Sequence, residues 1–346
     1  MCDNICVMLS FLLASAVLWQ GPALAGDGVA WTEQSRGTNA LRVWTQNRGV
    51  RVVYRGESLA VMRPFAVSGR RIAFERSYPS CPPPAGHVCP EGADAVIGPL
   101  AGPFRPLTRA RTCFLPGLGK TLALDGRTAA YVQLDCTRQR LQVVVGDVVV
   151  RDAPISSGCC RAIAVAGRYV AWSEGGGIVV RDWVAGRTAY RARIAADFDF
   201  DLQRDGKVAV AFRSTVAWLS PSLPLLHLVP MRGRATGVHI AGDRIAFERV
   251  HGRERSALVV AELEGGARTV ATFTGRTSLR GFDFDGLRVA WASDRVTARR
   301  VDCPPPGEGR PCVRRVSGVT SIWRRALRGG PSRLVARLRY ADAFGR

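Results

Sequence analysis

Lysine is nearly missing from this chain of 346 residues. Lys120 and Lys207 are the only lysines among 49 basic side chains, so arginine carries almost all of the positive charge and the formal net charge is +21. The arginines are spread through the whole sequence and do not gather on one helix or tail, which argues against a specific nucleic-acid site. The charge alone still predicts nonspecific attraction to anionic polymers and membrane surfaces.

Motifs of several common catalytic folds are missing as well. The sequence has no G-x-S-x-G elbow, no P-loop, no G-x-G-x-x-G after a strand and no H-E-x-x-H. These absences exclude α/β-hydrolases, P-loop nucleotide hydrolases, dinucleotide-binding domains and zincin metalloproteases. His87, His227 and His251 are isolated, so we expect them to be loop or surface residues.

Long apolar runs are confined to the N-terminus. Residues 7–19 form one apolar run, and Ala23-Leu24-Ala25 behind it has the small-residue pattern of a signal-peptide cleavage site. No other stretch approaches the roughly 18 apolar residues of a membrane-spanning helix. We therefore predict a signal peptide over 1–25, a secreted, periplasmic or cell-envelope location, and no transmembrane segment after cleavage.

What the sequence does contain is an internal repeat. A glycine, usually preceded by Asp or Ala, is followed after about two residues by Val or Ile, then Ala, then an aromatic residue, and seven copies of this pattern occur. The aromatic residues are Trp31, Phe74, Tyr131, Trp172, Phe212, Phe247 and Trp291. They are 43, 57, 41, 40, 35 and 44 residues apart. Periods of about 40 to 45 residues are typical of propellers or of helical arrays.

The pattern inside each repeat decides between these two architectures. Short runs of β-branched and aromatic residues follow the glycine turn, and alternating strands and further turns come next, as in 178–194 and 258–270. No window of 12 residues sustains a helical apolar period, which excludes a helical solenoid. We predict an all-β chain with one domain over 26–346. This domain is a seven-bladed β-propeller of four-stranded antiparallel blades, with six or eight blades as alternative counts.

The repeat resembles that of the TolB-like, WD-like propellers. It shares with them an Asp-Gly turn, a Val/Ile-Ala-Trp/Phe strand and a later strand that ends in Asp or Glu, as in 285–291 and 178–182. The resemblance covers essentially all of 26–346 and implies the fold, but it implies no partner.

The C-terminus predicts how the ring closes. If the mature chain begins at residue 26, it begins directly at a glycine turn and lacks the innermost strand of its first blade. Residues 340–345 align with 281–286, which are predicted to be an innermost strand and its turn. We therefore predict that the C-terminal strand completes the first blade and leaves no open edge.

Eight cysteines follow the predicted signal peptide, an even number that favours disulfides in an exported protein. The segments 81–89 and 303–312 each run from one cysteine to another, contain three consecutive prolines and have no C-x-x-C pair, which favours a local disulfide over zinc. We predict the pairs Cys81–Cys89 and Cys303–Cys312. The pairing of Cys113, Cys136, Cys159 and Cys160 is open. Because a bridge between adjacent residues is strained, we expect Cys159 and Cys160 to bond to different partners.

Polar residues in the predicted innermost strands supply a candidate metal site. Aligned before the repeat glycine, the strands of blades five, six, seven and one carry Asp199, His239, Asp283 and Asp342. Innermost strands line the channel of a propeller, so these side chains can converge on a divalent cation. The alternative is that each one hydrogen-bonds the backbone of the next blade. We favour the hydrogen bonds.

Two classes of function remain open. The favoured one is a monomeric, non-catalytic module that uses its disulfide-stapled face to bind a protein or a cell-envelope polymer. The other is a metal-dependent hydrolase or lyase in the style of propeller lactonases, with the cation held in the channel by the four residues named above. Since a single histidine accompanies the carboxylates, we expect no enzyme, and no cofactor unless the channel holds a divalent cation.

Overall fold

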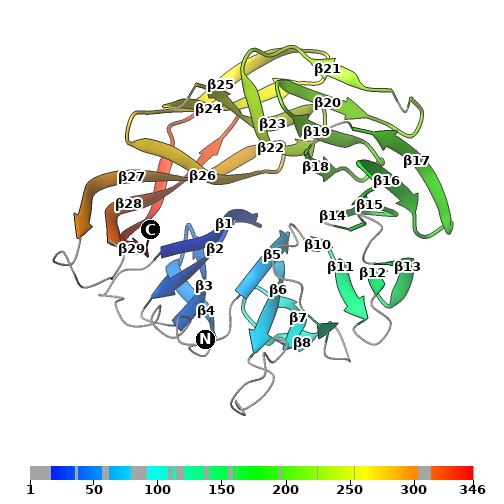
Figure 1. The fold of residues 1–346 in the computed structure, drawn as a ribbon, viewed down its shortest axis with the longest axis horizontal. Coiled ribbons are helices and arrows are strands. Elements are labelled where there is room, and N and C mark those ends of the chain that lie inside the picture. The colour runs from blue at the N-terminus through cyan, green and yellow to red at the C-terminus, as the bar shows by residue number, and fades with distance from the viewer. Residues whose placement is uncertain are drawn as a thin grey trace, which may run out of the picture.

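The chain forms a ring of β-sheets, as a computed structural model shows (Figure 1). The structure describes residues 17–35, 38–56, 62–78, 92–107, 112–113, 121–135, 140–154, 159–160, 162–194, 197–223, 225–252, 254–302 and 313–345.

The first three blades contain thirteen strands, one of which lies between two blades. Blade one is β1 (Val17–Ala25), β2 (Gly28–Ser35), β3 (Thr38–Thr45) and β4 (Gly49–Gly56). Blade two is β5 (Met62–Ser68), β6 (Arg71–Tyr78), β7 (Gly92–Pro99) and β8 (Arg105–Pro106). The short β9 (Thr112–Cys113) pairs with both β7 and β11 and so joins blades two and three. Blade three is β10 (Leu122–Asp125), β11 (Thr128–Asp135), β12 (Arg140–Val145) and β13 (Val148–Pro154).

The remaining four blades each have four consecutive strands. Blade four is β14 (Ile163–Ala166), β15 (Tyr169–Glu174), β16 (Gly177–Asp182) and β17 (Arg187–Arg193). Blade five is β18 (Asp199–Leu202), β19 (Val208–Phe212), β20 (Thr215–Leu219) and β21 (His227–Val229). Blade six is β22 (Arg234–Ala241), β23 (Arg244–His251), β24 (Arg255–Glu262) and β25 (Gly265–Thr274). Blade seven is β26 (Thr277–Phe284), β27 (Arg288–Asp302), β28 (Val313–Ala326) and β29 (Arg333–Gly345).

All strand pairs are antiparallel neighbours in sequence, apart from those that β9 makes. The seven-bladed, four-stranded propeller predicted from the repeat is therefore confirmed. Within the described residues, no helix is long and apolar enough to span a membrane.

The repeated aromatic residue fills the space between neighbouring blades. Trp31, Phe74, Trp172 and Phe247 are fully or almost fully buried. Trp172 of blade four packs with side chains of blade three, and Phe247 of blade six packs with side chains of blade five. Burying such a side chain contributes about 2 to 3 kcal/mol relative to leaving it exposed. The repeated aromatic residue thus marks the contact that packs each blade against the one before it.

The repeated glycine makes the turn between the first two strands of a blade. Gly69, Gly126 and Gly167 have φ values of +57°, +58° and +57°. Side chains other than hydrogen are disfavoured in this left-handed region. The glycine therefore marks the end of each innermost strand.

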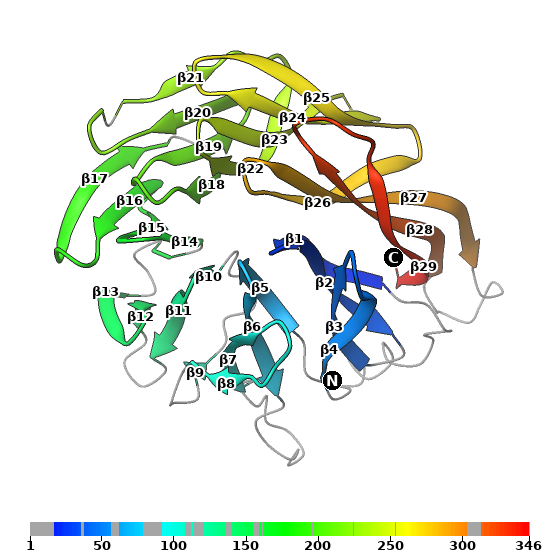
Figure 2. The ribbon, with the colours of Figure 1, turned by 180° about the vertical axis from the view of Figure 1, so that it is seen from behind.

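Ring closure differs from the prediction. The C-terminal strand β29 does not enter blade one; it is the outermost strand of blade seven and pairs with β28 along its whole length. Tyr340 lies opposite Gly318, where an added Cβ would come within 2.5 Å of the tyrosine hydroxyl, so this glycine makes room for the ring. Blade one takes its innermost strand from residues 17–25, which form β1, and β1 lies beside β26 of blade seven (Figure 2).

Candidate functional site

The innermost strands of all seven blades line a central cavity of about 1050 Å³. Blades one and four contribute small or apolar residues, such as Ala23 and Ile163. Blades five, six and seven contribute Asp201, His239 and Asp283. The polar lining is therefore concentrated on one side of the channel.

His239 lies at the centre of this polar sector. Its Nδ1 atom is 3.5 Å from a carboxylate oxygen of Asp201 and 3.5 Å from one of Asp283, and all three side chains are partly exposed. The ring of Phe282 meets the imidazole edge to face, with centroids 5.2 Å apart. The histidine is thus positioned between carboxylates of the blades on either side of its own.

Carboxylates of the innermost strands β18 and β26 accept hydrogen bonds from the backbone of the following blade. Asp283 Oδ2 accepts from the backbone N–H of Leu24 at 2.6 Å, which links blade seven to blade one. Asp201 and Asp199 of blade five accept from Ile240 and Gly237 of blade six at 3.1 and 3.0 Å. These bonds satisfy amides that would otherwise face the channel unpaired. The interpretation of Asp199 and Asp283 as hydrogen-bond acceptors for the next blade agrees with this geometry.

The four residues predicted to bind a metal do not come together. Asp342 lies on the outermost strand β29, opposite Val316 of β28. The innermost position that the alignment gave to the C-terminus is occupied by β1. In blade five, Asp201 and not Asp199 is the neighbour of His239. Asp199 lies opposite Ala211, the residue before the repeated aromatic, just as His239 lies opposite Ala246, whereas Asp201 lies two residues closer to the turn. Across the described residues, no three His, Cys, Asp or Glu side chains form a group that could hold a metal ion.

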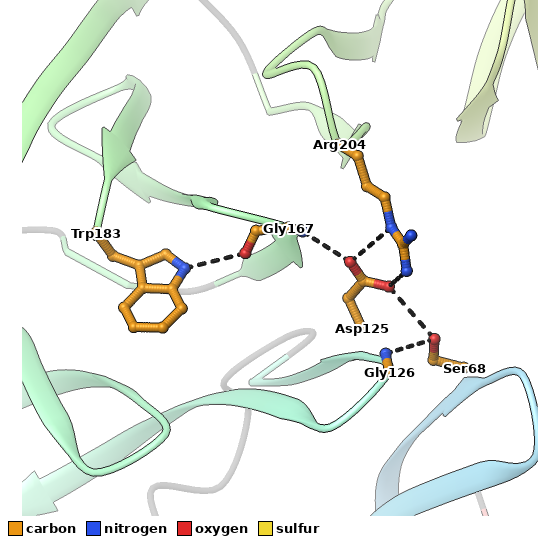
Figure 3. A network of polar contacts seen from close by, with 6 residues as sticks. All are labelled: Ser68, Asp125, Gly126, Gly167, Trp183 and Arg204. Atoms are coloured by element: carbon orange, nitrogen blue, oxygen red, sulfur yellow. Dashed lines mark hydrogen bonds and ion pairs between the residues drawn. The ribbon is translucent and has the colours of Figure 1, made fainter. Parts of the chain in front are cut away.

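A second polar network lies where the innermost strand β10 ends (Figure 3). Asp125 Oδ2 accepts from the backbone N–H of Gly167 at 2.7 Å, and both carboxylate oxygens accept from Arg204, at 2.9 and 2.7 Å. The hydroxyl of Ser68 is 3.5 Å from Asp125 and accepts from the N–H of Gly126 at 2.8 Å. One carboxylate therefore connects blades two, three, four and five.

The charge of Asp125 is stabilised by these contacts. Burial acts to raise the pKa of the carboxyl group, but the hydrogen bonds from Arg204 and Gly167 outweigh it and hold the pKa below its ordinary value. The same pairing raises the pKa of Arg204. Asp125 was not among the polar site residues predicted from the sequence, although it is the Asp of a repeated Asp-Gly turn.

The cysteines are only partly described. The structure joins Cys159 to Cys160, so the expectation that they bond to different partners is wrong. Cys160 has a φ of 71°, in the left-handed region that residues other than glycine seldom adopt. Cys113 lies in β9, opposite Gly92 and Leu134. The other predicted disulfide residues, Cys81, Cys89, Cys136, Cys303 and Cys312, lie outside the described residues.

Comparison with known proteins identifies the fold and no family. No protein-family model matches the sequence, and no curated protein matches it. The chain is similar to the β-propeller domain of the trilobed protease from Pyrococcus furiosus, with 11% identity, a TM-score of 0.62 and coverage of 94% of this chain and 97% of that one. That propeller is described as having an open velcro topology.

Two larger proteins contain a similar propeller. A prolyl endopeptidase shares 15% identity with a TM-score of 0.58 over 92% of this chain and 54% of its own. Prolyl oligopeptidase B from Galerina marginata shares 11% identity with a TM-score of 0.58 over 95% of this chain and 51% of its own. The chain thus spans about half of each of these proteins. At such identities the similarity shows the β-propeller fold alone.

Proposed function

We propose that this chain is an exported, non-catalytic β-propeller that binds a negatively charged partner, either a protein or a polymer of the cell envelope. The observation that carries the proposal is where the charge lies. The outermost strands β17 and β25 place arginines at exposed positions, including Arg187, Arg191 and Arg268. A basic rim on a chain of net charge +21 attracts anionic surfaces over the distance that salt permits.

The channel supports binding better than catalysis. Asp283 accepts hydrogen bonds from the N–H groups of Leu24 and Phe284, and Asp201 accepts one from Ile240. The bonds from Leu24 and Ile240 link neighbouring blades, and a carboxylate that accepts such bonds has less capacity left for a cation. The alternative, a metal-dependent hydrolase or lyase, rests on His239 standing between Asp201 and Asp283.

Binding can be measured with a matched pair of polymers. Dextran sulfate and uncharged dextran share one backbone, so a difference between them reports charge alone. We expect the purified protein to bind immobilised dextran sulfate at physiological ionic strength, to lose affinity steeply as salt rises, and not to bind dextran. Equal binding to both polymers, or none to dextran sulfate at physiological salt, contradicts the proposal.

Metal analysis tests the alternative. Elemental analysis after dialysis is expected to show no stoichiometric divalent cation, and a chelator is expected to leave the melting temperature unchanged. One tightly held cation per chain would favour the channel enzyme over the binding module.

A further inference from the structure

Two arginines of blade seven cover a tryptophan of blade one. Trp44, at the end of β3, is 6% exposed and belongs to the apolar cluster between these blades. The guanidinium carbon of Arg333 lies 5.0 Å from the centre of its ring, and that of Arg324 lies 5.9 Å away. Both distances are in the range of cation–π contacts. Both positive charges therefore contact the same aromatic ring.

The same two arginines face each other across neighbouring strands. Arg324 of β28 is the direct register partner of Arg333 of β29. Like charges in directly opposite positions destabilise a sheet. Among the described residues, no carboxylate forms an ion pair with either of them, whereas Arg168 and Arg204 each have one, in Asp182 and Asp125.

The surroundings add to the positive potential. Burial lowers the pKa of Arg324, and the charges of Arg288 and Arg333 lower it further, while Asp27 and Asp285 act in the opposite direction. Asp285 is already held by Arg288, whose Nε donates to it at 2.8 Å. The positive charge at this junction is thus partly desolvated and incompletely balanced.

We propose that Arg324 and Arg333 form a binding site for an oxyanion, the phosphate or sulfate group of an anionic polymer. Two neighbouring guanidinium groups can both donate to the oxygens of such a group, and both lie within cation–π distance of Trp44. The anion supplies the negative charge that the junction lacks. The proposal rests on the proposed binding function and locates one contact point of it.

Pyrophosphate is the probe for this site. Isothermal titration calorimetry in low-phosphate buffer is expected to show binding to the full chain. Arg324→Gln and Arg333→Gln should each weaken it by about 10-fold or more, since each removes one charged fork. Arg337→Gln removes the same charge from an exposed position of the same strand β29 and should change affinity less than twofold. Arg333 is also exposed, so its variant keeps the test independent of folding.

The outcomes separate the site from the general function. Absence of pyrophosphate binding, or an equal loss in Arg337→Gln, overturns the site. If dextran sulfate binds the wild type and the Arg333→Gln variant equally well, the binding function stands and this site falls. If pyrophosphate binds at Arg324 and Arg333 but dextran sulfate does not bind, the site stands and a polymer ligand is overturned. Parallel titrations with pyrophosphate and with inorganic sulfate show whether the site prefers a phosphate or a sulfate group.

A second inference follows independently from β1. Leu24 and Ala25 are 6% and 1% exposed, and residues 23–25 pair in register with residues 28–30 of β2. The Ala23-Leu24-Ala25 sequence is therefore part of the innermost strand of blade one. A second small-residue pattern, Ala14-Ser15-Ala16, stands directly before Val17, the first residue of β1.

We infer that export removes the leader after Ala16 and leaves β1 intact. A mainly apolar stretch over 7–13, interrupted only by Ser10, precedes this pattern, and its length is within that of a signal-peptide core. Mass spectrometry and N-terminal sequencing of the exported protein should find Val17 as the first residue. Ala14→Leu should block processing, and Ala23→Leu, the matched change at the other pattern, should not. A mature N-terminus at Gly26, or an exported chain that keeps residues 1–16, overturns the inference.

Discussion

Arg204 and Arg324 each bring a guanidinium group to a junction between blades, in opposite electrostatic settings. Arg204 donates to both oxygens of Asp125, and the pairing raises its pKa. Arg324 lies over Trp44 and opposite Arg333, and burial together with the neighbouring arginines lowers its pKa. In the first arrangement the arginine charge is balanced by a carboxylate of the same chain, and the pair links blades three and five. The second is short of negative charge, and this difference distinguishes a structural arginine from one available to a ligand.

Removal of β1 is expected to lower stability most, because β1 lies at the junction of blades seven and one. A chain that begins at Gly26 loses the buried side chain of Leu24 and leaves Asp283 without the Leu24 amide. Loss of one buried leucine already costs about 2 to 5 kcal/mol, so we expect the free energy of unfolding to fall by at least about 3 kcal/mol relative to a chain beginning at Val17. Urea denaturation of both chains, produced without export, measures it. Coincident unfolding curves would mean that β1 is not part of the ring.

The contribution of the Asp125 contacts to stability is tested by Asp125→Asn. The change keeps the shape but removes the charge that Gly167 and Arg204 contact, and hydrogen bonds to charged groups are worth about 1.5 to 3 kcal/mol. Because Arg204 is largely exposed and screened, we expect a loss of about 1 to 2 kcal/mol at pH 7. As the matched control, Asp205→Asn alters an exposed pair with Lys207 and should cost less than about 0.5 kcal/mol.

The pH dependence of the same variant has a defined sign. The folded-state pKa of Asp125 is lower than its unfolded value, so its contribution is fully present above about pH 4 and disappears as the pH falls through the folded-state pKa. The stability difference between the wild type and Asp125→Asn should therefore shrink on acidification below about pH 4. A difference that stays constant down to pH 2 contradicts the assignment.

The arginine side of this pair is expected to matter less. Arg204→Gln leaves the Gly167 amide on Asp125 and removes a surface-exposed partner. We expect a loss of about 0.5 to 1 kcal/mol at low salt that largely vanishes in about 1 M NaCl. A salt-independent loss larger than that of Asp125→Asn would reverse the roles assigned to the two residues.

The smallest effect, and one of opposite sign, is expected at Arg333. Arg333→Glu replaces a repulsion across the strands by an attraction to Arg324, which outweighs the lost contact with Trp44. We expect the protein to gain about 0.5 kcal/mol at low salt while it loses pyrophosphate binding. A purely structural role for the pair predicts the reverse, a loss of stability with pyrophosphate binding unchanged.

The fold could be predicted from the sequence because one local pattern encodes it. The glycine turn and the Val-Ala-aromatic strand are contiguous in the chain, and each aromatic such as Trp172 or Phe247 fills the same kind of gap between blades. Ring closure could not be predicted in this way. Residues 340–345 and 281–286 share a pattern. Only the pairing of Tyr340 with Gly318 shows that residues 340–345 belong to the outermost strand of blade seven.

The polar sites were less predictable because they depend on contacts between distant residues. Asp125 and Arg204 are 79 positions apart and meet only when the ring forms. Asp201 was missed because it lies two residues closer to the turn than Asp199, the position that the repeat alignment selected. Arg324 and Arg333 are close in sequence, yet their opposition follows from the strand register and their shared aromatic from a third strand, β3.

The distinction between the two arginines is tested most directly by one calorimetric comparison. Arg324→Gln and Arg204→Gln remove the same charge from the same protein, so bulk electrostatics affects both equally. We expect pyrophosphate affinity to fall by about 10-fold or more in Arg324→Gln and by less than twofold in Arg204→Gln. Equal losses in the two variants would show that only net charge attracts the anion and would contradict a defined site at the junction of blades seven and one.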